Sequence, residues 1–249
     1  MAIAVPLLLY IGVCVAMFAF QRSLLYYPQP RLVTAPESTM PLHVQGADLV
    51  ITVRAHSGPK AILYFGGNGE DVSANLESFS QAFPDYALFL LHYRGYGGST
   101  GTASETAIHS DAASLFRTVS AQHPDVAVIG RSLGSGVAVR LASENRVARL
   151  VLVTPYDSIE AIAAAQYPYL PVKLLLLDRY QSWKYAPAIT APTTIVAAQN
   201  DEVIPRANTE KLFARFPKGV ATMTVIAGVG HNDIGTKNEY LQTIQAALQ

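Results

Sequence analysis

The chain has 249 residues, half of them hydrophobic, and its 18 basic residues are balanced by 18 acidic residues. A chain of this size can bury one large core as a single α/β domain, and a neutral charge without a Lys/Arg cluster excludes the basic surface that nucleic-acid binding requires. With Cys14 as the single cysteine, an internal disulfide and a Cys/His zinc cage are also excluded, and we expect no metal site.

The N-terminal segment is apolar. Residues 2–20 contain no charged side chain, and Arg22 is the first charge. About 20 apolar residues suffice to span a bilayer, so residues 1–22 are predicted to be a membrane anchor. The protein is accordingly expected to be associated with a membrane through this single segment. A buried N-terminal helix and a cleaved signal peptide are the alternatives, although no small-x-small cleavage site stands out near residues 16–20. Residues 23–249 form the predicted catalytic domain.

Beyond Pro41, short apolar runs alternate with longer mixed segments. Strands are predicted for seven such runs, at residues 48–55, 61–67, 86–95, 126–130, 150–155, 193–199 and 222–228. Helices are predicted between them, over residues 73–83, 104–122, 134–144, 206–216 and 237–248. This alternation predicts an α/β fold with a mostly parallel central sheet and helices on both faces. Active sites of such sheets lie at the carboxyl ends of the strands.

A nucleophile motif follows the fourth of these runs. Residues 130–134, "GRSLG", match G-x-S-x-G between a predicted strand and a predicted helix. Gly130 and Gly134 would permit a turn sharp enough to hold Ser132 in a strained conformation. The helix N-terminus adds positive potential where an oxyanion would form. An ordinary glycine-rich turn or a phosphate loop is the alternative, but this turn lacks G-x-G-x-x-G and the chain lacks Gly-Lys-Ser/Thr.

A serine nucleophile needs a base, and the base needs an acid that orients it. On sheets of this kind the three residues follow the chain order Ser, acid, His. Asp201 and His231 each follow a predicted strand, at the same edge of the sheet as Ser132. We therefore predict Ser132 as nucleophile, Asp201 as acid and His231 as base. The rival acids are Asp157, Glu202 and Asp233.

The five other histidines are predicted to have no catalytic role, since a lone histidine is usually structural or solvated. His43 and His56 precede the predicted core sheet, and His92 precedes Tyr93. His109 and His123 are predicted to lie in or beside a helix on the surface.

A glycine-rich loop, "GGNGED" at residues 66–71, begins at the end of the strand predicted over residues 61–67. It is a candidate for oxyanion binding. In sites of this type, one donor is the N–H after the nucleophile and the other comes from this loop. These would be the N–H groups of Leu133 and Asn68. The neighbouring glycines let the backbone approach a substrate carbonyl closely. A flexible turn without function is the alternative.

Several segments together resemble the membrane-anchored branch of the α/β-hydrolase superfamily, which includes protein depalmitoylases and monoacylglycerol or lysophospholipid lipases. They are "FQRSLLYYP", "YFGGNGED", "LHYRGYGGSTG", "VIGRSLGSGVAVRLA", "VTPYDSI", the stretch from Tyr167 to Pro205, and "GVGHND". The resemblance implies the α/β-hydrolase fold and the same five roles for Ser132, Asp201, His231, Asn68 and Leu133. The chain departs from the family where Gly66 stands in place of a histidine and where His92 stands in place of a frequent aspartate.

The expected activity is that of a serine hydrolase that cleaves carboxylic esters or thioesters through an acyl-enzyme, without a cofactor. Residues of about 155–190, after the sixth strand, are expected to form a small cap over the site. Their Leu and Tyr side chains could shape an acyl-binding cleft or could pack the cap onto the body. A membrane anchor favours a lipid or acylated substrate. A serine peptidase and a membrane-tethered, non-catalytic interaction protein are the alternatives.

Overall fold

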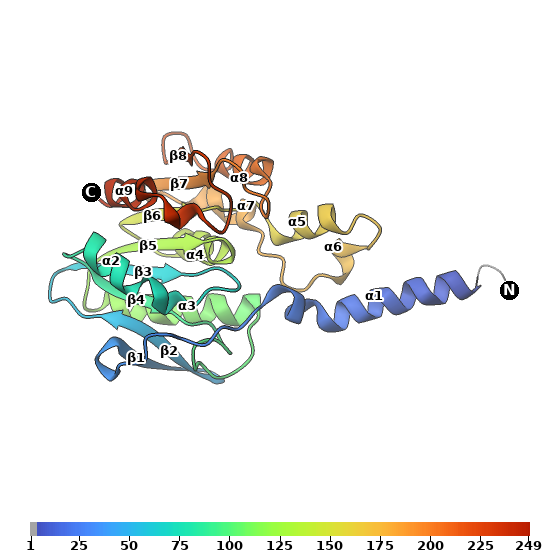
Figure 1. The fold of residues 1–249 in the computed structure, drawn as a ribbon, viewed down its shortest axis with the longest axis horizontal. Helices are drawn as coiled ribbons and strands as arrows, with labels where there is room; N and C mark the ends of the chain where they lie inside the picture. Colours follow the sequence, from blue (N-terminus) through green and yellow to red (C-terminus); the bar gives the residue numbers. More distant parts are fainter. Residues whose placement is uncertain (1–3) are drawn as a thin grey trace.

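Eight strands form one sheet in the order β1-β2-β4-β3-β5-β6-β7-β8 in the computed structural model, which describes residues 4–249 (Figure 1). The pairs β1/β2 and β2/β4 are antiparallel, and every other neighbouring pair is parallel. The strands are β1 (Thr39–Val44), β2 (Ala47–Arg54), β3 (Lys60–Phe65), β4 (Ala87–Leu91), β5 (Asp125–Arg131), β6 (Arg149–Val153), β7 (Thr193–Ala198) and β8 (Ala221–Ile226).

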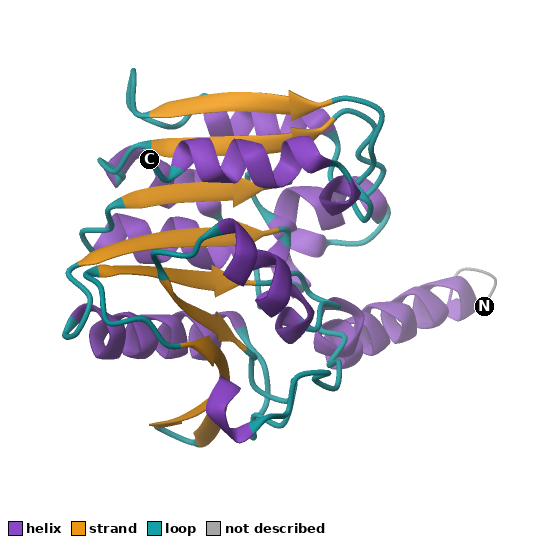
Figure 2. Ribbon diagram, turned by 60° about the vertical axis from the view of Figure 1, so that its left-hand side comes forward, coloured by secondary structure: helices purple, strands orange, loops and turns teal. Residues whose placement is uncertain are grey.

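Helices cover both faces of this sheet (Figure 2). Side chains of α3, α4 and α8 belong to the apolar cluster on one face, and those of α2 and α9 belong to the cluster on the other. The helices are α1 (Ala4–Leu25), α2 (Leu76–Ala82), α3 (Glu105–Ser120), α4 (Leu133–Glu144), α5 (Ile159–Gln166), α6 (Val172–Leu175), α7 (Ser182–Tyr185), α8 (Arg206–Phe213) and α9 (Asn238–Ala247). Short 3₁₀ turns lie at Pro36–Ser38, Val72–Asn75, Ala186–Ala188 and Ile234–Thr236.

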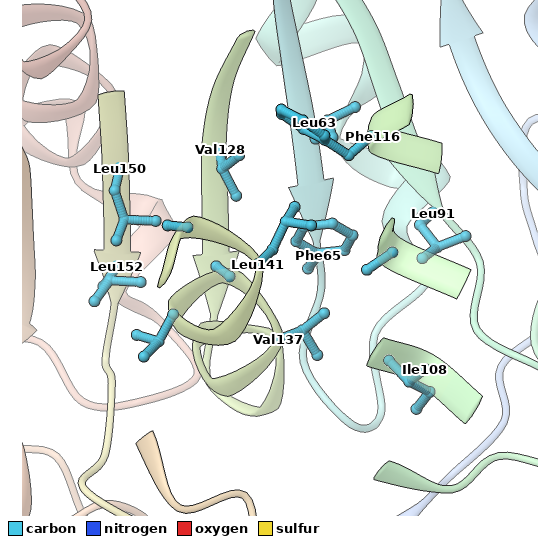
Figure 3. Close-up of a cluster of buried hydrophobic side chains, with 14 of the residues drawn as sticks. Leu63, Phe65, Leu91, Ile108, Phe116, Val128, Val137, Leu141, Leu150 and Leu152 are labelled. Carbon is cyan, nitrogen blue, oxygen red and sulfur yellow. The ribbon is translucent and has the colours of Figure 1, made fainter. Parts of the chain in front are cut away.

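The apolar runs of the strands fill both layers of the core because successive side chains of a strand point to opposite faces. In β3, Leu63 and Phe65 pack against the side of α3 and α4, whereas Ile62 and Tyr64 pack on the side of α2 and α9. All four side chains are fully buried. Figure 3 shows the first of these layers, in which Leu63 and Phe65 lie close to residues of α3 and α4.

The predicted fold class is confirmed: the sheet is mostly parallel and has helices on both faces. Each of the seven predicted strands is present, and each of the five predicted helices is present with ends that differ by a few residues. The first turn of the helix predicted over residues 73–83 is a 3₁₀ turn that precedes α2. The edge strand β1 was not predicted. Its sequence, TMPLHV, contains a proline and a histidine and is only partly buried, so it lacks the apolar run that marks the other strands.

Residues between β6 and β7 form the cap, which contains the short helices α5, α6 and α7. The cap therefore follows the sixth strand of the sheet, as expected; this strand is the fifth of the seven predicted runs because β1 was not predicted. In Figure 1, α5 and α6 lie between the body and α1, which extends away from the sheet. Helix α1 has 22 residues, is uncharged except for Arg22 and is the one helix of residues 4–249 that is long and apolar enough to cross a membrane. At 1.5 Å per residue its length is about 33 Å, close to the thickness of a bilayer core.

Candidate active site

Ser132 lies at the sharp turn between β5 and α4, at the carboxyl end of the central strands. Its backbone angles are φ 50° and ψ −118°, a conformation that non-glycine residues rarely adopt. A Cβ atom on Gly130 would lie 2.4 Å from the carbonyl oxygen of Gly134, and one on Gly134 would lie 2.0 Å from that of Phe65. The turn thus requires both glycines, and strain of this kind commonly costs about 1–3 kcal/mol and is concentrated at functional sites.

The loops after β7 and β8 bring Asp201 and His231 to Ser132. The Nε2 atom of His231 lies 2.9 Å from the Oγ of Ser132, and its Nδ1 lies 2.9 and 3.0 Å from the two carboxylate oxygens of Asp201. A carboxylate can only accept, so the Nδ1–H donates to Asp201 and leaves the Nε2 lone pair facing the serine hydroxyl. The structure therefore brings together the three residues that the sequence singles out, in the order that proton abstraction from Ser132 needs.

Asp201 is itself held in place. Its Oδ1 accepts hydrogen bonds from the backbone N–H groups of Val203 and Ile204, at 3.0 and 2.7 Å. Its side chain is 6% exposed and that of His231 is 5% exposed. Burial strengthens the interaction between the two groups, and the backbone donors fix the position of the carboxylate.

The rival acids have other partners. Asp157 accepts from the side-chain amide of Asn208 at 2.7 Å, and Asp233 accepts from the Gly230 N–H at 2.6 Å. Glu202 accepts from the backbone N–H of His231 at 3.2 Å and not from its ring. Among the acids of residues 4–249, Asp201 is the one that contacts the imidazole of His231 within hydrogen-bond distance.

The expectation for two other histidines was wrong, since His109 and His123 are buried and not on the surface. His109 lies on the inner face of α3 against the ring of Tyr180, with 5.5 Å between ring centroids. The Nδ1 of His123 forms a hydrogen bond with the Gly58 carbonyl at 2.8 Å. His43 lies within β1 and His56 lies between β2 and β3, so neither precedes the sheet as expected.

The glycine-rich loop after β3 passes over Ser132. A Cβ atom on Gly67 would lie 3.7 Å from the Cβ of Ser132, and Asn68 and Leu133 both line the hollow that contains Ser132. Neither of the backbone N–H groups of Asn68 and Leu133 has an acceptor within residues 4–249. The side chain of Asn68 points elsewhere, because its Nδ2 donates to the Leu25 carbonyl at 2.9 Å. Both predicted donors are therefore beside Ser132 with unused N–H groups.

An ion pair that the sequence analysis missed fixes this loop. The Oε2 of Glu70 accepts from the Gly67 N–H at 2.7 Å and from the Arg131 Nη1 at 3.0 Å. Arg131 also donates to the carbonyl of His231, at 3.3 Å. The loop after β3, the nucleophile turn and the histidine loop are thus connected through one carboxylate. A single sequence contains no sign of this pairing beyond the position of Arg131 next to the nucleophile.

The second carboxylate oxygen of Glu70 has partners from β3 and from the 3₁₀ turn before α2. Its Oε1 accepts from the hydroxyl of Tyr64 at 2.6 Å and from the side-chain amide of Asn75 at 2.7 Å. Burial raises the pKa of Tyr64 well above its usual value, and the negative charge of Glu70 adds to the increase. The hydroxyl therefore stays protonated and continues to donate.

Gly66 fits the packing of this chain, although the family that the sequence resembles has a histidine at this position. A Cβ atom there would lie 2.5 Å from the Cγ1 of Val72. The Gly66 carbonyl accepts from the buried hydroxyl of Tyr93 at 2.9 Å. The contacts of Tyr93 and Glu70 hold the loop in an arrangement that leaves no room for a larger side chain at this position.

Sequence comparison places the chain among known proteins. Residues 60–185 match the family described as alpha/beta hydrolase fold. The uncharacterised protein Rv2307c of Mycobacterium tuberculosis is 33% identical over 252 residues, which cover 93% of this chain and 87% of that protein. The alpha/beta hydrolase domain-containing protein aho-3 of Caenorhabditis elegans is 29% identical over 65% of this chain and 48% of its own length.

Solved structures share the fold. The esterase Pf2001 of Pyrococcus furiosus superposes with a TM-score of 0.70 at 17% identity, over 90% of this chain and 98% of that one. Mouse alpha/beta hydrolase domain-containing protein 10 superposes with a TM-score of 0.65 at 14% identity, over 84% and 96% of the two chains. At these identities the superpositions establish the architecture alone. Together with the match over half of the sequence and the Mycobacterium relative, they show that this chain belongs to the α/β-hydrolase fold family.

Proposed function

We propose that the protein is a serine hydrolase that cleaves carboxylic ester or thioester bonds through an acyl-enzyme. The observation that carries the proposal is the chain of hydrogen bonds from Ser132 Oγ to His231 Nε2, at 2.9 Å, and from His231 Nδ1 to Asp201. Membership of the hydrolase fold family and the likeness to esterase structures support the reaction class. Fold alone would not, because one fold serves many functions.

In the proposed reaction, Ser132 Oγ attacks the substrate carbonyl carbon while His231 Nε2 takes the hydroxyl proton. The tetrahedral intermediate collapses, the bond to the leaving oxygen or sulfur breaks, and His231 returns the proton to the leaving alcohol or thiol. Water then attacks the acyl-enzyme, gives one proton to His231, and releases the acid as the proton returns to Ser132 Oγ. Asp201 stays ionised throughout and stabilises the imidazolium. These steps need no metal ion or organic cofactor.

The negative charge of the tetrahedral intermediate would be stabilised by the backbone N–H groups of Asn68 and Leu133. Their unused N–H groups and the N-terminus of α4 provide fixed positive potential beside Ser132. Such donors cost little reorganisation during the reaction because the fold already holds them. The Glu70–Arg131 pair maintains the position of the loop that contains Asn68.

We further propose that residues 1–22 anchor the catalytic domain, residues 23–249, to a membrane, and that the substrate is a lipid or an acylated molecule. Support comes from the length and apolar surface of α1 and from the composition of the hollow at Ser132. Aliphatic and aromatic side chains dominate its lining, among them Leu25, Tyr156, Ile159, Ile162 and Ile204. A hydrocarbon chain would bury apolar surface there.

The test is covalent labelling of the detergent-solubilised full chain with a fluorophosphonate, followed by intact mass measurement and peptide mapping. An activated serine displaces fluoride and retains the phosphonyl group. We expect one adduct on the wild type, at Ser132, none on Ser132→Ala, and one on Ser143→Ala, a serine of the same helix as the matched control. No adduct on folded wild type would overturn the proposal and favour a membrane-tethered, non-catalytic interaction protein. Relative turnover of ester, thioester and peptide substrates would then separate an esterase from a peptidase.

A further inference from the structure

Helix α1 is fastened to the cap by polar contacts. The side-chain amide of Gln21 donates to the Leu175 carbonyl at 3.1 Å and accepts from the Leu177 N–H at 2.7 Å. Nearer the start of α1, the Tyr10 hydroxyl donates to the Tyr169 carbonyl at 2.9 Å. Contacts at both halves of the helix keep its direction fixed relative to the cap. A flexible tether to a membrane would need none of them.

Asp178 of the cap holds the end of α1 to the body. Its carboxylate accepts from the Nε of Arg22 at 3.0 Å, from the Tyr26 hydroxyl at 3.2 Å and from the Glu105 N–H at 3.1 Å. The Asp178 side chain is only 6% exposed. A buried carboxylate with three donors is stable in one geometry only, since the loss of a partner leaves charge without compensation. Helix α1, the cap and the start of α3 therefore meet at one fixed point.

One face of α1 is covered, and the rest is exposed. Cys14, Met17, Gln21 and Leu25 are partly buried, at spacings of three and four residues that place them along one side of a helix. Helix α6 of the cap contacts α1, and Figure 1 shows the C-terminal half of α1 beside the cap. The remaining side chains of the helix are mostly exposed, including Val15 at 61%. The helix thus has a cap face and an outer face.

An apolar groove runs between the cap face of α1 and the cap. Helix α1 contributes Met17, Gln21 and Leu24, and the cap contributes residues such as Leu170, Val172 and Leu176. No charged side chain lines the groove, and its one amide, that of Gln21, is already bonded to the cap backbone. Apart from the Tyr167 hydroxyl the rest of the lining is apolar, and its chemistry suits a hydrocarbon chain.

The groove adjoins the hollow at Ser132. Four residues line both of them: Leu25, Ile159, Ala163 and Tyr167. At the outer side of the cap, Tyr169 and Leu174 are 88% and 82% exposed, an unusual exposure for large apolar side chains. Apolar lining therefore extends from the region of α1 to the nucleophile.

We propose that α1 is one wall of the acyl-chain site, so that the anchor itself takes part in substrate selection. The occupant of the groove is the unbranched hydrocarbon chain of a substrate that resides in a lipid surface. The chain enters between α1 and the cap, and its carbonyl end reaches Ser132 past Leu25 and Ala163. This inference deepens the proposed hydrolase function and depends on it. Helix α1 then holds the enzyme at the lipid surface and also contributes to its selectivity for acyl-chain length.

A larger side chain in the groove tests the proposal, because it should change the dependence of kcat/KM on acyl-chain length. In the full chain, Met17→Trp fills the groove from the α1 side, and Val15→Trp adds a similar ring on the outer face as the matched control. We expect Met17→Trp to lower the ratio of kcat/KM for p-nitrophenyl laurate over p-nitrophenyl acetate by about 10-fold or more, because a methylene in an apolar site alone changes selectivity this much. Val15→Trp should leave the ratio within about twofold. An unchanged ratio in Met17→Trp would overturn the proposal. Leu24→Trp repeats the test at a half-exposed position if Met17→Trp does not fold.

A direct map of the chain uses wild type and needs no variant. An alkyl fluorophosphonate with a diazirine near the end of a long alkyl chain is attached to Ser132, irradiated in detergent micelles, and the cross-linked peptides are identified. We expect cross-links to residues 17–24 of α1 and to residues 170–176 of the cap. Cross-links confined to the peptide around Val203 and Ile204, on the other side of the hollow, would refute the path described here. Failure of Ser132 to react at all would instead refute the proposed hydrolase function, so the two failures are distinguishable.

Discussion

The carboxylate of Glu70 and the guanidinium of Arg131 form an ion pair, with 3.0 Å between Oε2 and Nη1, that joins the loop after β3 to the residue just before Ser132. Both side chains are largely buried, at 11% and 20% exposure. The same oxygen of Glu70 accepts the Gly67 N–H, and Arg131 reaches the carbonyl of His231. The pair therefore acts on the position of two loops without contacting the Ser132 hydroxyl.

Glu70→Gln should lower kcat by on the order of 10-fold to 100-fold and leave KM for p-nitrophenyl acetate within about twofold. The reason is that a small displacement of the loop moves the Asn68 N–H away from the developing oxyanion, and errors of about 1 Å can cost 10²-fold in rate. Steady-state kinetics with Glu77→Gln, an exposed acid in α2 whose carboxylate accepts from Gln81 and not from the loop, provides the control. Equal kinetics of the two variants would show that Glu70 does not position the loop.

Asp201→Asn should reduce kcat by on the order of 10⁴, because an amide no longer holds His231 in the tautomer that accepts the serine proton. Asp157→Asn makes the same chemical change at a rival acid whose carboxylate is bonded to Asn208. Its kcat is expected to stay within a few-fold of wild type. A large loss in Asp157→Asn with a small loss in Asp201→Asn would reassign the acid.

Gly134→Ala should destabilise the fold by about 3 kcal/mol or more, since the added carbon meets the Phe65 and Gly66 carbonyl oxygens at 2.0 and 2.7 Å. Alanine would otherwise stabilise a helix by about 1 kcal/mol relative to glycine. Gly235→Ala is the matched change in open space, with its nearest contact at 3.9 Å, and should alter stability by less than about 0.5 kcal/mol. Urea unfolding of both variants measures the difference, and similar midpoints would contradict the steric argument.

Acid should destabilise the protein partly through His92. Burial lowers the pKa of His92 from 6.5 to about 4, and its Nε2 lies 2.8 Å from the Thr52 hydroxyl. Between pH 6.5 and about 4 the unfolded chain binds this proton and the folded chain does not, so stability falls as pH decreases through that window. Above pH 6.5 both states are neutral at this position and the contribution does not vary.

His92→Gln removes this dependence. Between pH 7 and pH 4, the free energy of unfolding of wild type should fall by about 3 kcal/mol more than that of the variant. Denaturant titrations at several pH values give the comparison, and groups other than His92 contribute equally to both proteins. Parallel pH profiles would mean that His92 is accessible to protons in the folded state.

The order of apolar runs and turn residues was enough to predict most of the fold. Seven strands contain apolar runs with Val, Ile or Leu, and the glycines around Ser132 indicate the turn in one pentapeptide. β1 was missed because an edge strand is half exposed and tolerates Pro41. α6 and α7 have four residues each, too few for a helical period to be visible.

The candidate site was predictable in part for a similar reason. Ser132, Asp201 and His231 each follow a strand, and the ends of parallel strands meet at one edge, so sequence order alone places them together. The Glu70–Arg131 pair joins residues 61 positions apart, and Leu25 reaches the hollow from a helix outside the sheet. Contacts of this kind depend on loop paths and on the direction of α1, which hydrophobic periodicity does not encode.

The contact of Arg22 with Asp178 has a consequence for biosynthesis. The two residues are 156 positions apart, and ribosomes add about 5–20 residues per second, so roughly 8 to 31 seconds pass between the synthesis of the first and of the second. During that interval the cap face of α1 exists without its partner. Met17 and Leu25 of that face then need cover from lipid or a chaperone, which the nascent cap later displaces. The docking of the cap is thus an exchange of one apolar neighbour for another.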